Sequence, residues 1–201
     1  MIDLYLTRHG QTIWNVEVRM QGRLNSPLTD DGIQGALKLR KKISGIRFSE
    51  CYTSPMPRAL HTALLLIGDR RVPLVVEDTL AEMDLGIWEG MSAAAAKEEH
   101  PEVFYQFRHR PDLFVPPDGG ESFTDVVIRA QDFLKKIEAL PDDTGAVLGV
   151  THCILLQAIM MLCDGRPLST LRTGQDVDQT ALFHLQWDHN TWHVISRNEP
   201  S

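Results

Sequence analysis

Short apolar runs alternate along this 201-residue chain with longer segments whose apolar residues recur every three or four positions. An apolar run of about four to eight residues is typical of a buried strand, and the longer spacing is typical of an amphipathic helix. The runs predict strands at Ile2–Thr7, Phe48–Thr53, Leu74–Glu77, Ala146–Thr151, Ala181–Trp187 and Trp192–Ser196. The last two are separated by the turn-forming sequence Asp188-His189-Asn190, which predicts a hairpin.

Helices are predicted between these strands. One begins at Thr29, with Asp30 and Asp31 in a first turn that favours negative charge. The others are predicted at Met56–Ile67, Ser92–His100, Pro101–Arg110, Ser122–Leu140 and Ile154–Cys163, and a loop is predicted at Asp78–Gly90. Strands that alternate with helices predict a three-layer α/β/α sandwich with a mainly parallel sheet. We expect a single domain over residues 1–201, with a small helical cap insertion at about 92–117.

Basic residues follow three of the predicted parallel strands. The first strand runs into Arg8-His9, the second is followed by Arg58, and the strand at Ala146–Thr151 is followed by His152. The carboxyl ends of parallel strands share one edge of a sheet, where ligands commonly bind. Any one of these residues alone would more often make a surface ion pair or fill a core position. Together, two arginines and two histidines suit a phosphate group, since arginine binds phosphate through two parallel hydrogen bonds and neutral imidazole can attack phosphorus.

Composition limits the partners. The chain has 20 Lys and Arg against 27 Asp and Glu, a formal net charge of −7, with 43% hydrophobic and 23% charged residues. These values are ordinary for a soluble globular protein, and the acidic balance argues against a nucleic-acid or anionic-membrane partner. The three cysteines have no C-x-x-C spacing and predict free thiols. With neither a signal-peptide pattern nor a long apolar run, we expect a cytoplasmic location.

Signatures of other chemistries are missing. The sequence has no G-x-x-x-x-G-K-[ST], G-x-G-x-x-G, H-E-x-x-H or G-x-S-x-G motif. Asp176-Val177-Asp178 is a lone D-x-D pattern, which we interpret as a solvated loop rather than a magnesium site. We therefore expect no metal and no cofactor.

Six segments resemble, in order, the motifs of one known family. They are LTRHGQTIWN, QGRLNSPLTDDGIQGA, YTSPMPRALHTA, LAEMDLGIWEG, GGES and VTHCILLQ. Together they cover most of the chain, and they are similar to the motifs of the histidine phosphatase superfamily, specifically its phosphoglycerate-mutase-like branch.

The resemblance implies catalytic roles for residues that match the family motifs. His9 matches the nucleophile, which would form a phosphohistidine. Arg8 and Arg58 match the arginines that clamp the phosphate, and His152 matches the second histidine, which stabilises the transferring group. Glu82 matches the acid that protonates the leaving oxygen, and Glu89 in the same loop is a less favoured alternative.

The resemblance also implies phosphate binding by Asn15, Gln21 and Gly22. The chain departs from the family pattern at Cys153, where glycine is usual after the second histidine. It departs again at Gln179-Thr180, where asparagine and a small residue are usual. Cys153 could crowd the pocket, and Gln179 could still reach the pocket rim, although we do not expect a catalytic role for it.

These features favour a metal-independent phosphomonoester hydrolase that acts on a small phosphorylated metabolite. A cofactor-dependent phosphoglycerate mutase is the first alternative. The tyrosine-containing stretch that mutases carry after the acidic residue is replaced here by MDLGIWEG. A non-catalytic phospho-ligand-binding protein is the second alternative. In the predicted cap, Arg108 and Arg110 could bind a second anionic group, although a solvated helix end is the favoured interpretation of both. Nothing in the sequence predicts an oligomeric state.

Overall fold

A six-stranded mixed sheet forms the centre of the molecule, as seen in a computed structural model that describes residues 1–199. The strands lie in the order β3-β2-β4-β1-β5-β6. Pairing is parallel from β3 to β1, and β5 runs antiparallel to both β1 and β6. The bounds are β1 Ile2–Arg8, β2 Phe48–Thr53, β3 Leu74–Val76, β4 Ala146–Thr151, β5 Leu182–Trp187 and β6 Trp192–Glu199.

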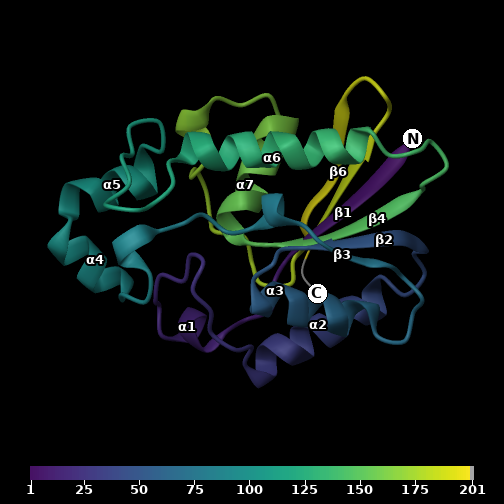
Figure 1. The fold of residues 1–201 in the computed structure, drawn as a ribbon, viewed down its shortest axis with the longest axis horizontal. Helices are drawn as coiled ribbons and strands as arrows, with labels where there is room; N and C mark the ends of the chain where they lie inside the picture. Colours follow the sequence, from purple (N-terminus) through teal and green to yellow (C-terminus); the bar gives the residue numbers. More distant parts are fainter. Residues whose placement is uncertain (200–201) are drawn as a thin grey trace.

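Helices cover both faces of this sheet and give the predicted α/β architecture (Figure 1). Helices α6 and α7 pack together on one face, and α2 and α3 pack together on the other. The α-helices are α1 Ile13–Val16, α2 Asp30–Lys42, α3 Pro57–Ile67, α4 Ala93–Glu99, α5 Pro101–His109, α6 Phe123–Glu138 and α7 Cys153–Cys163. Short 3-10 helices lie at Asp78–Leu80, Gly86–Trp88 and Leu168–Thr170.

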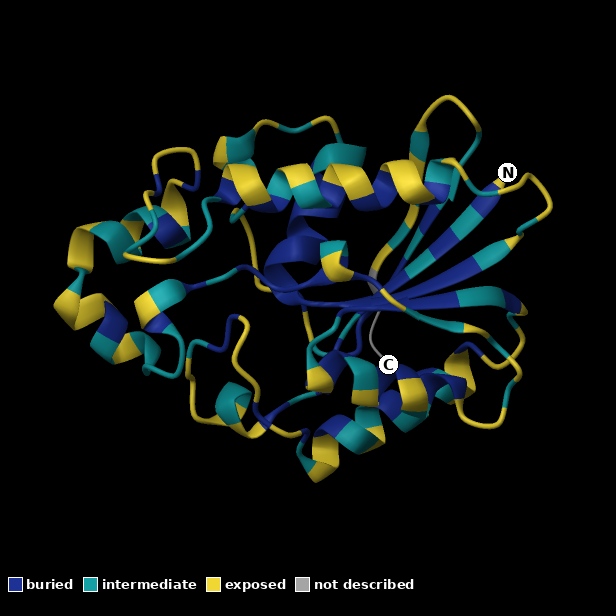
Figure 2. Cartoon of the chain, in the orientation of Figure 1, coloured by how far each residue is buried: buried dark blue, intermediate teal, exposed yellow. Residues whose placement is uncertain are grey.

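Side-chain alternation along the strands divides the core into two clusters. On β4, Val147 belongs to the cluster beneath α6 and α7, whereas Leu148 and Val150 belong to the cluster against α2 and α3. This division follows from the period-two alternation of a strand, which sends successive side chains to opposite faces. Figure 2 shows the buried strands between helices whose outer faces are exposed.

Most predicted elements are confirmed with small differences at their ends, and one α-helix was missed, as was the 3-10 helix at Leu168–Thr170. The expected loop at Asp78–Gly90 holds two single-turn 3-10 helices, and β6 runs three residues past Ser196. The missed α-helix is α1, which has four residues and buries none of them, so it leaves no apolar periodicity to detect. No helix within residues 1–199 is long and apolar enough to cross a membrane.

Helices α4 and α5 lie in the segment expected to form a cap, at the end of the molecule away from the N-terminus (Figure 1). An aromatic cluster ties this segment to the core. The Phe107 ring lies 5.6 Å from Trp88 and 5.5 Å from Phe114, and Phe114 lies 5.3 Å from Phe123 at the start of α6. Such pairs add directional stabilisation to apolar burial, so α5 is held in place beside the strand ends.

Candidate active site

The carboxyl ends of three parallel strands align at one edge of the sheet. Arg8 is in register with Thr151, and Thr53 is in register with Val150. The backbone N–H of His9 then donates to Thr151 O at 2.9 Å, and that of Ser54 donates to Val150 O at 3.0 Å. The backbone hydrogen bonds between the strands therefore continue past the strand ends, and they fix the positions of His9 and Ser54.

His9 is 3% exposed, and its hydrogen bonds define the tautomer. Its Nδ1 lies 2.8 Å from the carbonyl oxygen of Gly10, which can only accept, so the proton is on Nδ1. The Nε of Arg58 lies 3.3 Å from His9 Nε2 and donates to it. His9 therefore carries an unprotonated Nε2, the atom that a nucleophilic imidazole requires.

Close backbone packing explains the glycine that follows His9. A side chain at Gly10 would meet the carbonyl oxygen of Gly32 in α2 at 2.6 Å, too close for any Cβ. The Gly10 N–H donates to Thr62 Oγ1 at 3.0 Å, and this hydroxyl donates in turn to Arg58 O. The turn after β1 therefore packs closely against α2 and is hydrogen-bonded to α3.

Arg58 is 2% exposed and is held by the loop that precedes α2. Its two terminal nitrogens donate at 2.6 Å to the carbonyl oxygens of Leu24 and Gly22, and its backbone N–H donates to Asn25 Oδ1. Burial lowers the pKa of Arg58 to about 10, which leaves the guanidinium charged at neutral pH. It is a fixed cation beside His9 Nε2.

His152 is fully buried, and its ring centroid lies 5.1 Å from that of His9. Its Nε2 lies 2.7 Å from Ser54 Oγ, which accepts from the Met56 N–H. In the tautomer in which the Ser54 hydroxyl donates to Nε2, the proton of neutral His152 lies on Nδ1. Within the described chain Nδ1 has no hydrogen-bond partner, so a buried donor is left for a ligand.

Burial and the neighbouring cations keep both histidines neutral. Burial lowers the pKa of His9 well below its usual value, with further lowering by Arg58 and Arg8. Burial likewise lowers the pKa of His152, aided by Arg58. Buried imidazoles among cations lose protons readily, because the charged form is both desolvated and repelled.

Two glutamates of one loop have different surroundings, and only Glu82 lines the pocket. Glu82 is 8% exposed and accepts from the Met83 N–H at 2.9 Å and from the Ile154 N–H at 3.4 Å. The Glu89 carboxylate instead accepts from three backbone N–H groups, those of Arg23, Leu24 and Leu85. Glu89 therefore holds the loop together, and a side chain at Gly22 would collide with its carboxylate.

Asn15, Gln21 and Gly22 all line the same pocket. The Oδ1 of Asn15 accepts from the backbone and hydroxyl of Thr12 in a capping box, which turns the amide so that Nδ2 is left without a partner among the described residues. Gln21 is buried, and its Oε1 likewise has no partner there. Gly22 contributes its carbonyl to Arg58.

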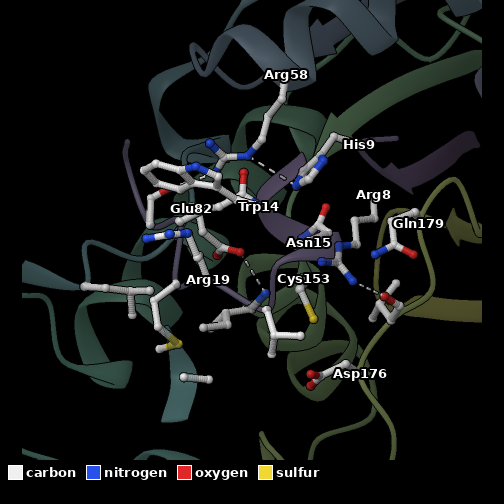
Figure 3. Close-up of a pocket in the computed structure, with 18 of the residues that line it drawn as sticks. Arg8, His9, Trp14, Asn15, Arg19, Arg58, Glu82, Cys153, Asp176 and Gln179 are labelled. Carbon is white, nitrogen blue, oxygen red and sulfur yellow. Dashed lines mark hydrogen bonds between the residues drawn. The ribbon is translucent and has the colours of Figure 1, made fainter. Parts of the chain in front are cut away.

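The pocket has a volume of about 400 Å³ and an excess of positive charge. Of the described residues, five arginines and three carboxylates line it. Arg8 donates through Nη1 to Val177 O at 2.5 Å, and its buried Nε lacks a partner within the part of the chain that is described. Figure 3 shows His9, Arg8, Arg58, Asn15 and Glu82 around one cavity. The predicted residues therefore converge, although fully buried His152 adjoins His9 without being among the residues that line the pocket.

The sequence did not predict every charged side chain that lines the pocket. Arg172 was not singled out. Arg108 lies in the partly solvated last turn of α5, as the interpretation of a solvated helix end expects, but it also lines the pocket. Arg110 does match that interpretation, since it is exposed and pairs with Asp112. Asp176 matches the solvated-loop interpretation in that it is exposed and lies in a loop, but it also lines the pocket and pairs with both Arg108 and Arg172. No sequence signal marks such partners. Arg172 and Asp176 lie in a loop, and Arg108 lies far from both along the chain.

Cys153 and Gln179 also line the pocket. Cys153 is the first residue of α7 and is 8% exposed, and burial raises its thiol pKa. The thiol is therefore neutral and packs as a small apolar group. Among residues 1–199 no group of three or more His, Cys, Asp or Glu side chains is placed to hold a metal ion.

The fold and the site place this protein in a class defined by a histidine at the end of the first strand with arginines around it. The chain belongs to the histidine phosphatase superfamily (branch 1), whose family model matches residues 4–200. Phosphoserine phosphatase 1 from Hydrogenobacter thermophilus is 29% identical over 191 residues, covering 94% of this chain and 90% of that protein.

Other relatives extend the comparison. A 2,3-bisphosphoglycerate-dependent phosphoglycerate mutase from Methylobacterium sp. is 34% identical over 176 residues, which cover 84% of this chain and 83% of that protein. Among solved structures, Bacillus stearothermophilus YhfR superposes with a TM-score of 0.95 at 36% identity, covering 100% of this chain and 98% of that one. The family and its phosphatase relatives identify this chain as a phosphatase of the histidine type.

Proposed function

We propose that this protein is a metal-independent phosphomonoester hydrolase that acts on a small phosphorylated metabolite through a phosphohistidine at His9. The observation that carries the proposal is the buried, unprotonated Nε2 of His9, held beside the Arg58 guanidinium in a positively charged pocket. Relatives named for small phosphorylated substrates, such as a phosphoserine phosphatase, support the substrate class.

The first chemical step is attack of His9 Nε2 on phosphorus. The Nε2–P bond forms, the bond from phosphorus to the ester oxygen breaks, and that oxygen takes the electron pair. Arg8, Arg58 and His152 stabilise negative charge on the three non-bridging oxygens, which is where charge is spread in phosphoryl transfer. The unpartnered Arg8 Nε and His152 Nδ1 fit this role, since buried donors without partners are costly unless a ligand accepts from them. Asn15, in the same pocket, offers its Nδ2 as a further donor.

Glu82 serves as the acid and then as the base. Its carboxyl protonates the departing oxygen, because His9 cannot attack phosphorus and donate a proton at the same time. The resulting carboxylate then accepts a proton from water as that water attacks the phosphohistidine. This second step releases phosphate and restores both His9 and the protonated Glu82.

The test is phosphate release from a panel of phosphorylated metabolites with EDTA present, with isomer formation measured in parallel. We expect hydrolysis that survives EDTA and that His9→Ala lowers by about a thousandfold or more. The matched control is His61→Ala, which removes an exposed histidine from α3 outside the pocket and should retain wild-type rates.

Two results would contradict the proposal. Isomer formation without net phosphate release would show a mutase. Hydrolysis that EDTA abolishes and added metal restores would show a metal-dependent enzyme.

A further inference from the structure

The pocket continues beyond the phosphate end to a cluster of three charged side chains, Arg108, Arg172 and Asp176. Arg108 comes from α5, and the other two come from the segment between α7 and β5. In Figure 3 Asp176 lies on the opposite side of Cys153 from His9. A group bound at this cluster would belong to the part of the substrate remote from the phosphate.

Arg172 is a fixed part of this cluster. Its side chain is 4% exposed and donates to Gln157 Oε1. It pairs with Asp176 at 3.0 Å and lies over the Phe107 ring, 5.4 Å from its centroid. The Nε is buried without a partner in the described chain, so this guanidinium has an unused donor.

Arg108 is the accessible cation of the cluster. Its side chain is 40% exposed and makes one hydrogen bond, from Nη1 to Asp176 Oδ2 at 3.2 Å. The other N–H groups of its guanidinium have no hydrogen-bond partner in residues 1–199, so they are available to a ligand. A carboxylate matches the planar arrangement of these donors.

Charge decides which anion fits. Asp176 is ionised, because Arg172 and Arg108 lower its pKa even though burial acts in the opposite direction. Two guanidinium groups therefore share one carboxylate, which leaves one positive charge on the cluster. A single carboxylate neutralises the charge of these three side chains, while Arg8, which also lowers the pKa of Asp176, and Asp178, which also lines the pocket, lie in their surroundings.

We propose that Arg108 and Arg172 form a specificity subsite for a carboxylate, so that the preferred substrate is a phosphomonoester with a carboxylate at the end remote from the phosphate. This inference rests on the proposed hydrolase function and adds the substrate class. His9 and Arg58 then bind the phosphate end of the substrate, and Arg108 binds the carboxylate end.

The test uses two matched series of phosphomonoesters, both unbranched. One series ends in a carboxylate and has two to about five carbons, and the other ends in a hydroxyl at the same chain lengths. The readout is the ratio of kcat/KM for acid and alcohol at each length. We expect the wild-type ratio to peak at one length at about tenfold or more, which is the size of one charge-assisted hydrogen bond.

Three variants locate the effect. Arg108→Met should bring the ratio close to 1, and Arg108→Lys should keep part of the preference because it keeps the charge. Arg110→Met is the matched control, since Arg110 lies on the same helix end outside the pocket and pairs with Asp112. It should keep the wild-type ratio.

The subsite is wrong if the wild-type ratio is close to 1 at every length, or if Arg108→Met leaves the ratio unchanged. Hydrolysis of p-nitrophenyl phosphate by the wild-type protein separates this result from failure of the proposed function. If that ester is hydrolysed and His9→Ala abolishes the reaction, the hydrolase stands and only the subsite falls. If neither that ester nor any member of the two series is hydrolysed, the proposed function itself is contradicted.

Discussion

Glu82 and Glu89 show how two residues of one type, seven positions apart, take different roles. The Glu89 carboxylate accepts from three backbone N–H groups and holds the loop that presents Gly22 and Leu24 to Arg58. Glu82 faces the pocket with two acceptor contacts, one of them long at 3.4 Å. Glu82 therefore makes fewer structural hydrogen bonds than Glu89, which supports the proposal that Glu82 transfers the proton.

Replacement of this acid should affect substrates according to their leaving groups. We expect Glu82→Gln to lower kcat/KM for an alkyl phosphate by about a hundredfold or more, the usual contribution of a general acid. The kcat/KM for p-nitrophenyl phosphate should fall far less, because nitrophenolate leaves without a proton. Stopped-flow or steady-state rates with both esters provide the measurement.

Glu89→Gln is the comparison for this experiment. It disturbs the loop rather than proton transfer, so any loss should be the same for both esters. An equal loss with both esters in Glu82→Gln would contradict the assignment of Glu82 as the acid.

At the scale of elements, strand ends explain most of what the sequence predicted. Strands β2 and β4 have the predicted bounds, because an apolar run in a two-sided sheet begins and ends where burial does. The convergence of Arg8, His9, Arg58 and His152 then follows from parallel pairing. Their individual roles came from the resemblance to a family rather than from periodicity.

What the sequence did not predict depends on contacts between distant segments. Arg108 and Arg110 are two residues apart at the end of α5, yet only Arg108 reaches the pocket, where it meets Asp176 from a loop 68 residues later. Helix α1 was missed because it buries no residue. Periodicity records burial within one element, and it carries no information on which polar groups meet across elements.

At the scale of the whole molecule, a positive pocket lies in an acidic protein. The chain has a formal net charge of −7, but five arginines face three carboxylates in the cavity. A concave cationic site attracts an anionic ligand, while the negative charge elsewhere disfavours large polyanions. This distribution fits a small phosphate ester better than a nucleic acid.

The two buried histidines should make folding stability depend on pH. Both have a folded-state pKa well below the usual 6.5, so the unfolded chain takes up protons first as the pH falls. Their contribution to the free energy of unfolding is complete above the usual pKa of 6.5 and is lost as the pH falls below it. We expect the free energy of unfolding to fall between pH 7 and 5.5, by up to about 1.4 kcal/mol per pH unit for each histidine.

Urea unfolding at several pH values measures this effect. A variant with His9 and His152 both replaced by glutamine should lose most of the slope, whatever its stability at pH 7. A free energy of unfolding that does not change over this range in the wild-type protein would contradict neutral burial of the two rings.

The central claim is that His9 carries the phosphoryl group during turnover, and the Glu82→Gln variant tests it most directly. With p-nitrophenyl phosphate, phosphorylation of His9 needs no acid, but attack by water lacks its base. We therefore expect a burst of about one nitrophenolate per enzyme and a base-stable phosphoryl group on the peptide that contains His9. Linear nitrophenolate release with phosphate in step and no phosphoryl group on His9 would contradict the account.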